Sequence, residues 1–335
     1  MDTDAGRPMR VGVIGTGFGA RVVAPAFEAS GCEVVDVVSA RDRRSVEALC
    51  RSELALVSVH APPFLHREYV CRAVDAGHAV MCDKPFGVSV DDAAAMTEAA
   101  QSAGVPNFLN FEFRHQAARR AMAELLVSGA VGSAEHLSYT ALTSGSRVPL
   151  RRWGWLFDRS RGGGWIGAFG SHAIDLARWL LGDIVHAGAT TWIHITERPD
   201  ADGSLHRCDA EDAFVGWAET RSGATVTVDS SFTAGAPLTP RIVLVGSEGV
   251  IENIGDRRVV VRRSDGSTEQ LEFEPRGGDP HGEAMNAWTA VIREAVSTGL
   301  PIGPSFVDGL ACMRVMEQWR ERDPSEVGDF DAGTE

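Results

Sequence analysis

Short apolar runs alternate with helix-like segments over the first 120 residues, and this alternation restricts the fold more than any other feature. The runs are rich in β-branched residues, as strands are. They lie at Arg10–Ile14, Val34–Ser39, Leu54–Val59, Ala79–Cys82 and Phe108–Phe111. The helix-like segments between them are Ala20–Ala29, Ser45–Cys50, Arg67–Ala76 and Val90–Ala103. Strands that alternate with helices form a parallel sheet covered on both faces, so the sequence predicts an α/β, doubly wound N-terminal domain.

The pattern changes after about residue 118. Helices are expected at Arg119–Val127 and His172–Leu181, with a glycine- and tryptophan-rich loop before the second, and two more end the pattern at His281–Ser297 and Ser305–Arg322. The predicted strands are Ala134–Leu142, His186–Thr196, Ala213–Glu219, Ala224–Phe232, Arg241–Val245, Val259–Arg263 and Glu269–Phe273. Alternation with period 2 in Ala224–Phe232 indicates a sheet with one buried face. We expect domains over residues 1–118 (α/β) and 119–323 (α+β, mostly antiparallel), and a flexible acidic tail over residues 324–335.

Composition excludes several classes of protein. The net charge of −14 argues against non-specific nucleic-acid binding, which needs a basic surface. No apolar run approaches the length of a membrane helix, and the start of the chain lacks the apolar core of a secretory signal. The six cysteines show no CxxC spacing, as expected of reduced thiols in the cytoplasm. The ten histidines show no HExxH or similar spacing, so we predict no metal site.

A glycine-rich segment, Gly15–Ala20 (GTGFGA), joins the first predicted strand to the first predicted helix. Gly15 permits the tight turn, Gly17 lets the backbone approach a pyrophosphate, and Ala20 is small enough for helix–strand packing. The helix N-terminus adds free N–H groups and the positive end of a dipole. Because the segment follows a strand and opens a helix, it predicts a Rossmann dinucleotide site. The expected contacts are Gly15, Thr16, Gly17, Phe18 and Gly19.

The end of the second predicted strand bears on the choice of cofactor. An NAD site usually has an acid there for the ribose 2′-hydroxyl, whereas an NADP site has a nearby arginine. Here Ser39 occupies the tip, and Arg41, Arg43 and Arg44 follow. This favours NADP, with Ser39, Arg41 and Arg44 as contacts. Asp42 as the ribose acid would instead favour NAD, and this alternative stays open.

The chain contains 31 arginines and a single lysine, Lys84. Arginine is a permanently charged fork, whereas lysine is a compact donor whose pKa falls readily on burial. A position that keeps lysine indicates a need for an amine that gives and takes a proton; the alternative is a coding bias that left one lysine by chance. Lys84 follows the strand Ala79–Cys82 at the carboxyl edge of the predicted sheet, where ligands bind. That location favours a functional lysine.

Together these segments resemble the Gfo/Idh/MocA family of sugar and cyclitol oxidoreductases, which includes glucose–fructose oxidoreductase and inositol dehydrogenase. The resemblance covers nearly the whole chain. It is carried by Gly15–Ala20, Val59–His66 (VHAPPFLH), Cys82–Pro85 (CDKP), Gly162–Gly182 (GGGWIGAFGSHAIDLARWLLG) and Val245–Glu252 (VGSEGVIE). It implies a Rossmann domain followed by a large open-faced sheet, and dehydrogenase activity on a carbinol or keto carbon of a sugar, amino sugar or cyclitol. It also implies a homodimer or homotetramer built through the sheet.

The resemblance also implies roles for single residues. Lys84 would bind the reacting oxygen and His172 would relay its proton, so both are predicted to be catalytic. Asp175, one helical turn after His172, would orient the imidazole or make a structural hydrogen bond. Further cofactor contacts are expected from His60, Pro62, His66, Asp83, Lys84 and Pro85.

An arginine cluster with interleaved tryptophans lies in the loop that leads into the Gly-rich segment: Arg147, Arg151, Arg152, Arg159 and Arg161, with Trp153, Trp155 and Trp165. Arginine binds carboxylates or phosphates, and tryptophan stacks on sugar rings. Two interpretations stay open: an anionic or ring-shaped substrate, or a contact between subunits. The predicted substrate-binding residues are Lys84, Asn110, Arg114, Arg152, Trp153, Trp165, His172 and Asp175.

Three departures from the family pattern matter. Asp83 replaces the usual Glu before the lysine, and Ala168 replaces an Asp that is common four residues before the histidine. The connection from Arg41 to Leu54 is also too short for the family's fuller αβ unit, so we expect a trimmed sheet edge. Because Ala168 does not titrate, two alternatives remain: a redox-neutral enzyme that uses bound NAD(P) transiently for epimerisation, elimination or hydrolysis, or a non-catalytic dinucleotide-binding subunit.

Overall fold

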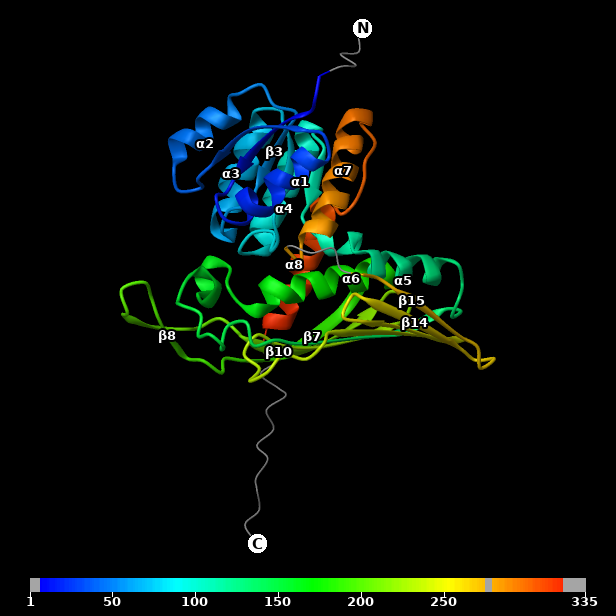
Figure 1. Ribbon diagram of the computed structural model, residues 1–335. Helices are drawn as coiled ribbons and strands as arrows, with labels where there is room; N and C mark the ends of the chain where they lie inside the picture. The colour runs from blue at the N-terminus through cyan, green and yellow to red at the C-terminus, as the bar shows by residue number, and fades with distance from the viewer. Residues whose placement is uncertain (1–6, 275–278, 322–335) are drawn as a thin grey trace.

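The computed structural model describes residues 7–274 and 279–321, so the predicted tail at 324–335 lies outside the described residues. Two sheets organise the chain (Figure 1): a compact N-terminal one among helices, and a broad second one with helices on the side that faces the first. The expected α/β architecture with a separate, mostly antiparallel sheet is confirmed.

The N-terminal sheet has five parallel strands in the order β2-β1-β3-β4-β5. The strands are β1 (Arg10–Ile14), β2 (Glu33–Val38), β3 (Leu56–Val59), β4 (Ala79–Cys82) and β5 (Asn107–Leu109). β3 pairs with β1 rather than lying beyond β2, so β2 is the edge strand. The short connection after Arg41 therefore trims this edge, as the sequence predicts.

Helices connect these strands. They are the π-helix η1 (Gly19–Val23) with α1 (Ala24–Ala29), α2 (Arg43–Cys50), α3 (His66–Asp75) and α4 (Val90–Ala103). The start of α4 shows why the sequence specified it well: Ser89 accepts a hydrogen bond from the backbone N of Asp92 at 3.1 Å, and Asp91 and Asp92 occupy its first turn. A hydroxyl cap and acidic residues stabilise the positive end of a helix.

The second sheet has eight strands in the order β15-β14-β13-β12-β6-β11-β10-β7, antiparallel except for the pair β6–β11. They are β6 (Ala134–Leu142), β7 (Ile184–Trp192), β10 (Ala213–Thr220), β11 (Thr225–Ser231), β12 (Arg241–Gly246), β13 (Gly249–Ile254), β14 (Arg258–Arg263) and β15 (Thr268–Glu272). Buried and exposed residues alternate along β10 and β11. One face is covered by α5 (Ala117–Val127), α6 (Ser171–Leu181) and α8 (Phe306–Arg320), and the other is open (Figure 1).

Three strands were not predicted, and the limits of a fourth differ most from the prediction. The list of expected strands lacked β13, and it lacked the small hairpin of β8 (Glu197–Pro199) and β9 (Leu205–Arg207). The strand expected at His186–Thr196 instead spans Ile184–Trp192, because the chain leaves the sheet edge towards that hairpin.

The helix α7 (Gly282–Thr298) follows the second sheet in sequence but packs on the first. Its buried Trp288 meets Phe108 of β5 edge-on, with ring centroids 6.0 Å apart, and Thr289 donates to the carbonyl oxygen of Ala26 at 2.9 Å. The first residue of the next helix, Phe306 of α8, donates its backbone N–H to Asn107 Oδ1 of β5 at 3.0 Å. The division at residue 118 stays a prediction, and the packing shows that α7 and α8 join the two units.

The described helices include none long and apolar enough to cross a membrane. All six cysteines are free thiols, five of them buried. That state agrees with the reduced, mostly buried cysteines that the sequence predicts.

Candidate active site

The nucleotide loop has the geometry that its glycines suggest. Gly15 has φ +137°, and a Cβ there would collide with the carbonyl oxygen of His60. A Cβ on Gly17 would meet nothing within 4 Å, which leaves room for a ligand against the backbone. The helix η1 begins two residues later, at Gly19. These residues fit a dinucleotide pyrophosphate, because the loop is open where the motif requires close approach.

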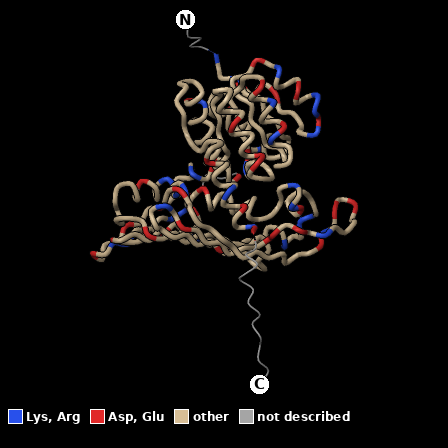
Figure 2. The backbone as a smooth tube through the Cα atoms, turned by 180° about the vertical axis from the view of Figure 1, so that it is seen from behind, with Lys and Arg blue, Asp and Glu red and all other residues tan. Residues whose placement is uncertain are grey.

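Asp42, the acid that follows the tip of β2, has a structural role. Asp42 caps α2, accepting from the backbone N of Arg44 at 3.1 Å and from Ser45 Oγ at 2.7 Å. The hydrogen bond from the Ser45 side chain lowers the pKa of Asp42. Arg41 and Arg44 are exposed, and Figure 2 shows basic residues along the part of the N-terminal unit at the upper right of that view. The carboxylate is thus engaged, whereas both guanidinium groups face solvent.

Asp83 lies at the centre of a hydrogen-bond network at the end of β4. Its Oδ1 accepts from the backbone N of Lys84 at 2.9 Å and from Asn110 Nδ2 at 3.2 Å, and its Oδ2 lies 3.3 Å from His60 Nδ1. Burial alone would raise the pKa of Asp83, but the hydrogen bond with His60 and the charges of His60 and Lys84 lower it to about 2. His60 also contacts Ser58 Oγ at 2.7 Å. The network fixes the backbone from which Lys84 extends.

Lys84 reaches across to the second unit. Its Nζ donates to the carbonyl oxygen of Ala168 at 2.7 Å. Ala168 lies in the π-helix η6 (Ile166–Gly170), which runs directly into α6. The position that would carry the family's carboxylate therefore still meets the lysine, but through its backbone carbonyl.

His172 lies one turn further along, on α6, and is 3% exposed. Its ring stacks on Phe113 with centroids 4.2 Å apart and meets Phe111 edge-on at 5.8 Å. Neither ring nitrogen has a hydrogen-bond partner in the described part of the chain. Burial, followed by the positive charges of Lys84, Arg119 and His281, lowers the pKa of His172 well below its usual value. The imidazole is therefore neutral at pH 7 and has a lone pair available.

Asp175 does not orient that imidazole. Its carboxylate accepts two hydrogen bonds from Arg114, at 2.8 and 2.5 Å, and Arg114 also approaches Asp308. Of the two roles left open for Asp175, the structure shows the structural one. Burial would lower the pKa of Arg114, but Asp175 outweighs it and the pKa is raised.

The other predicted residues divide between interior and surface. His66 is fully buried at the start of α3, where its Nε2 lies 2.7 Å from the carbonyl oxygen of Ala61. Trp165 stacks on Phe232 with centroids 4.1 Å apart and donates to Ser230 Oγ. Of the remaining predicted residues, one is buried (Pro85), four are half-buried (Phe18, Ser39, Pro62 and Trp153) and two are exposed (Thr16 and Arg152).

Most side chains of the arginine cluster contact other parts of the protein. Arg147 donates to the carbonyl oxygen of Thr233 at 2.6 Å, Arg159 donates to that of Arg320 at 3.3 Å, and the Arg161 guanidinium lies 4.5 Å from the ring centroid of Phe64. These contacts favour a structural role for most of the cluster.

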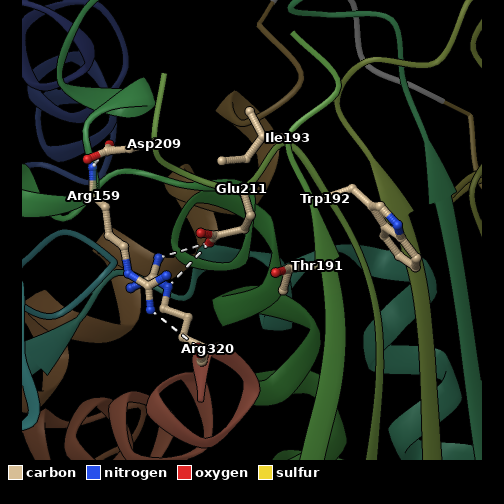
Figure 3. A pocket seen from close by; sticks show the side chains of 7 residues that line it. All are labelled: Arg159, Thr191, Trp192, Ile193, Asp209, Glu211 and Arg320. Carbon is tan, nitrogen blue, oxygen red and sulfur yellow. Dashed lines mark hydrogen bonds and ion pairs between the residues drawn. The ribbon is translucent and has the colours of Figure 1, made fainter. Parts of the chain in front are cut away.

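An open cavity of about 530 Å³ lies elsewhere, where the end of α8 meets the edge of the second sheet (Figure 3). Within it, Arg320 forms an ion pair with the buried Glu211 at 3.1 Å. Its lining residues are Arg159, Thr191, Trp192, Ile193, Asp209, Glu211 and Arg320. The cavity contains none of the predicted site residues, so it is separate from the lysine and histidine.

Sequence reasoning missed one pair at the site. Glu112 Oε1 lies 2.7 Å from His281 Nδ1, although the two residues are 169 positions apart. In the sequence, Glu112 follows the last predicted N-terminal strand and His281 begins a predicted helix, so neither position indicates the pair. The pair becomes visible only when α7 folds back onto the first unit.

Two family models match the chain. The model described as "Oxidoreductase family, NAD-binding Rossmann fold" matches residues 9–111, and the model described as "GFO/IDH/MocA C-terminal domain" matches residues 119–252. Together they cover the strands of the first sheet and the second sheet as far as β13.

Individual proteins similar to this chain point to the same family. Inositol 2-dehydrogenase 2 of Saccharopolyspora erythraea is 29% identical, over 92% of this chain and 91% of its own. D-xylose 1-dehydrogenase (NADP(+)) 2 of Haloferax volcanii is 31% identical, over 67% of this chain and 70% of its own. A solved structure of levoglucosan dehydrogenase in complex with NADH and L-sorbose superposes with a TM-score of 0.84 at 22% identity, covering 92% of this chain and 95% of its own. This likeness shows a shared fold.

Proposed function

The chain belongs to the Gfo/Idh/MocA family of NAD-binding oxidoreductases, and from this premise we propose that it transfers hydride between a nicotinamide cofactor and a carbinol or keto carbon. The proposed substrate is a sugar, amino sugar or cyclitol, since the relatives are named as dehydrogenases of xylose and inositol. One observation carries the proposal: the single lysine extends from the carboxyl edge of the first sheet to within 2.7 Å of the carbonyl oxygen of Ala168, one turn before His172.

Lys84 is proposed to bind the reacting oxygen. An ammonium group has three donors, and the carbonyl oxygen of Ala168 takes one of them. The others remain for the substrate hydroxyl or carbonyl. A fixed positive donor stabilises negative charge that develops on this oxygen, and removing such a donor typically costs about 10² to 10³ in turnover.

His172 is proposed to accept the hydroxyl proton during oxidation. Its lowered pKa keeps the imidazole neutral, and its nitrogens are free of intramolecular partners in the described residues. A base needs such a lone pair within reach of the proton it takes. The bound dinucleotide would supply the hydride acceptor or donor, and Gly15–Gly19 would hold its pyrophosphate.

We propose NADP as the preferred cofactor, with NAD as the alternative. Asp42 is engaged as the cap of α2, whereas Arg41 and Arg44 are exposed at the tip where an adenosine 2′-phosphate would lie. The relatives' names leave both cofactors open, because one specifies NADP(+) and the other was solved with NADH.

We propose that the protein forms a homodimer or homotetramer through the open face of the second sheet, and that it is cytoplasmic. On β10, Val215 and Trp217 are 46% and 52% exposed on that face. Exposed aromatic and aliphatic residues on a continuous sheet favour burial against another copy. The free cysteines agree with a reducing compartment.

A redox-neutral reaction remains the second candidate, and Ala168 favours it. A backbone carbonyl accepts a hydrogen bond but does not take a proton at neutral pH, unlike the carboxylate common at this position in the family. An enzyme that must return the proton to its substrate has no need of that carboxylate. Bound NAD(P) would then be reduced and reoxidised within one turnover.

The test is a substrate screen with Lys84 variants. The wild-type protein is incubated with cyclitols, aldoses and amino sugars plus NADP⁺ or NAD⁺, while absorbance at 340 nm and product formation are followed. We expect net reduction of cofactor, and loss of about 10² to 10³ in turnover for K84A with nearly unchanged cofactor affinity. K84R is the matched variant, because it keeps the charge without the titratable amine. Wild-type turnover in K84A contradicts the assignment, product without net cofactor change supports the redox-neutral reaction, and tight binding without turnover supports a binding subunit.

A further inference from the structure

A buried carboxylate holds an imidazole beside the nucleotide loop. Glu112 Oε1 lies 2.7 Å from His281 Nδ1, and the two side chains are 1% and 32% exposed. Glu112 begins the short 3-10 helix after β5, and His281 immediately precedes α7. Because α7 packs on the first unit, the pair joins the sheet edge that carries Lys84 to the helix that returns from the second sheet.

The ring of His281 contacts both ends of the candidate site. It meets Phe18 edge-on with centroids 5.2 Å apart and stacks on Phe113 at 5.2 Å. Phe18 lies between Gly17 and Gly19 of the nucleotide loop, and Phe113 also stacks on His172 at 4.2 Å. His281 is therefore next to the loop that would hold the pyrophosphate and one aromatic ring away from the proposed base.

The hydrogen bond to Glu112 determines what His281 presents to a ligand. A carboxylate that accepts a hydrogen bond from Nδ1–H leaves Nε2 as the free nitrogen, with its lone pair available to a ligand donor. The exposed fraction of the side chain agrees with a nitrogen that is open to a ligand.

Unpartnered buried atoms beside this pair indicate that something else binds there. Glu112 Oε2 and Asn110 Oδ1 are both buried and have no hydrogen-bond partner among the residues that the structure describes. Buried polar atoms nearly always have a partner. Two acceptors that lack donors at one end of the first sheet therefore point to a ligand that carries hydroxyl or amide donors, as the nicotinamide half of a dinucleotide does.

We propose that His281 contacts the nicotinamide half of the bound dinucleotide, and that Glu112 is the positioning residue that fixes its imidazole. The inference rests on the proposed function in one respect, that a dinucleotide binds to Gly15–Ala20. NADH and NADPH are identical in the half concerned and differ at the adenosine ribose. His281 therefore contributes equally to the binding of both, unlike Arg41 and Arg44.

The first experiment measures dissociation constants of NADH and NADPH by energy transfer from tryptophan. H281F keeps an aromatic ring against Phe18 and Phe113 but removes both nitrogens. We expect it to weaken the binding of both cofactors by the same factor, about tenfold, as for one charge-assisted hydrogen bond. The matched control is H194F, because His194 is also held through Nδ1 by a buried carboxylate, Asp212, at 3.1 Å, but in the loop after β7 of the second sheet. It should bind both cofactors as the wild type does.

The second experiment tests positioning by rescue. E112Q retains a side-chain oxygen for Nδ1, whereas E112A removes it. We expect E112A to weaken binding as H281F does, and E112Q to stay within about threefold of the wild type. Circular dichroism checks the fold of each variant, and E112M, which fills the space, replaces E112A if the alanine variant unfolds.

Several outcomes overturn the inference. Unchanged dissociation constants in H281F contradict the proposed contact. Unequal effects on NADH and NADPH contradict its assignment to the nicotinamide half. Equal binding by E112A and the wild type, or an E112Q as weak as E112A, removes the positioning role. These results do not depend on turnover, so they are separate from the K84A result; a wild-type protein that binds neither dinucleotide contradicts both proposals.

Discussion

Replacing Asp83 by Asn removes the charge at the centre of the network that supports Lys84. The carboxylate meets His60, Asn110 and the backbone N of Lys84, and its side chain is 18% exposed. An asparagine keeps the shape and one acceptor oxygen. The substitution therefore measures the interaction of the charge rather than the loss of packing.

The pKa of Asp83 gives the expected magnitude. Folding lowers it from the usual 3.8 to about 2, and each unit corresponds to about 1.4 kcal/mol. The ionised group therefore stabilises the fold by roughly 2 kcal/mol at pH 7. Because the folded pKa is the lower one, this stability is present above the unfolded pKa and is lost as pH falls towards 2. The difference between wild type and D83N should stay constant from pH 7 to 5 and fall to about 1 kcal/mol near pH 3.

Urea unfolding followed by circular dichroism at pH 7, 5 and 3 measures this difference. The matched control is D36N, because the exposed carboxylate of Asp36 accepts only a local hydrogen bond from Val37 among those described. We expect that control to change the free energy of unfolding by less than about 0.5 kcal/mol. A D83N variant as stable as the wild type at pH 7, or a difference that does not shrink at pH 3, would refute the reasoning.

Two further predictions concern the cofactor. G17A should fold with an unchanged melting temperature, since a Cβ there meets nothing within 4 Å. Its affinity for NADPH, measured by fluorescence, should fall at least tenfold because the methyl group occupies the space for the pyrophosphate. Normal affinity would place the cofactor elsewhere. The double variant R41A/R44A should raise the Michaelis constant for NADPH about tenfold or more while leaving that for NADH nearly unchanged, and an equal effect on both would show that these arginines do not distinguish the cofactors.

The fold was predictable where the capping residues and the apolar pattern of a segment indicate the same helix or strand. The limits of α4 and β6 match the predicted ones residue for residue, because α4 has a cap with acids in its first turn and β6 alternates regularly. The strand β13 was not recognised because Glu252, only 5% exposed, interrupts its apolar pattern. Its charge is met by Arg241 and Arg262 on the two neighbouring strands, which a single segment of sequence does not reveal.

The candidate site was predictable only in part, for a related reason. The strand ends place Asp83, Lys84 and Asn110 at one edge, and the structure joins Asp83 to Asn110 there. The partner of Lys84 is a backbone carbonyl 84 residues away, and no side-chain pattern indicates such a contact. Asp175 and Arg114 were both predicted to bind substrate, but they form an ion pair with one another. Both charged groups are removed from water, and each offsets the desolvation of the other.

Under the proposed roles of Lys84 and His172, the alanine at position 168 bears on the path of the substrate proton more than on how the substrate oxygen is held. Lys84 still meets position 168 through the carbonyl oxygen, so the ammonium keeps its orientation. The proton that leaves a substrate hydroxyl is not held by His172, because burial and positive neighbours lower the pKa of that imidazole well below its usual value. An imidazolium in that environment gives up its proton readily, and position 168 offers no carboxylate to take it. The proton therefore either passes to solvent through water or returns to the substrate. Net oxidation leaves the hydride on the cofactor and releases the proton to water, whereas a redox-neutral turnover returns the hydride to the substrate, so absorbance at 340 nm distinguishes the two reactions.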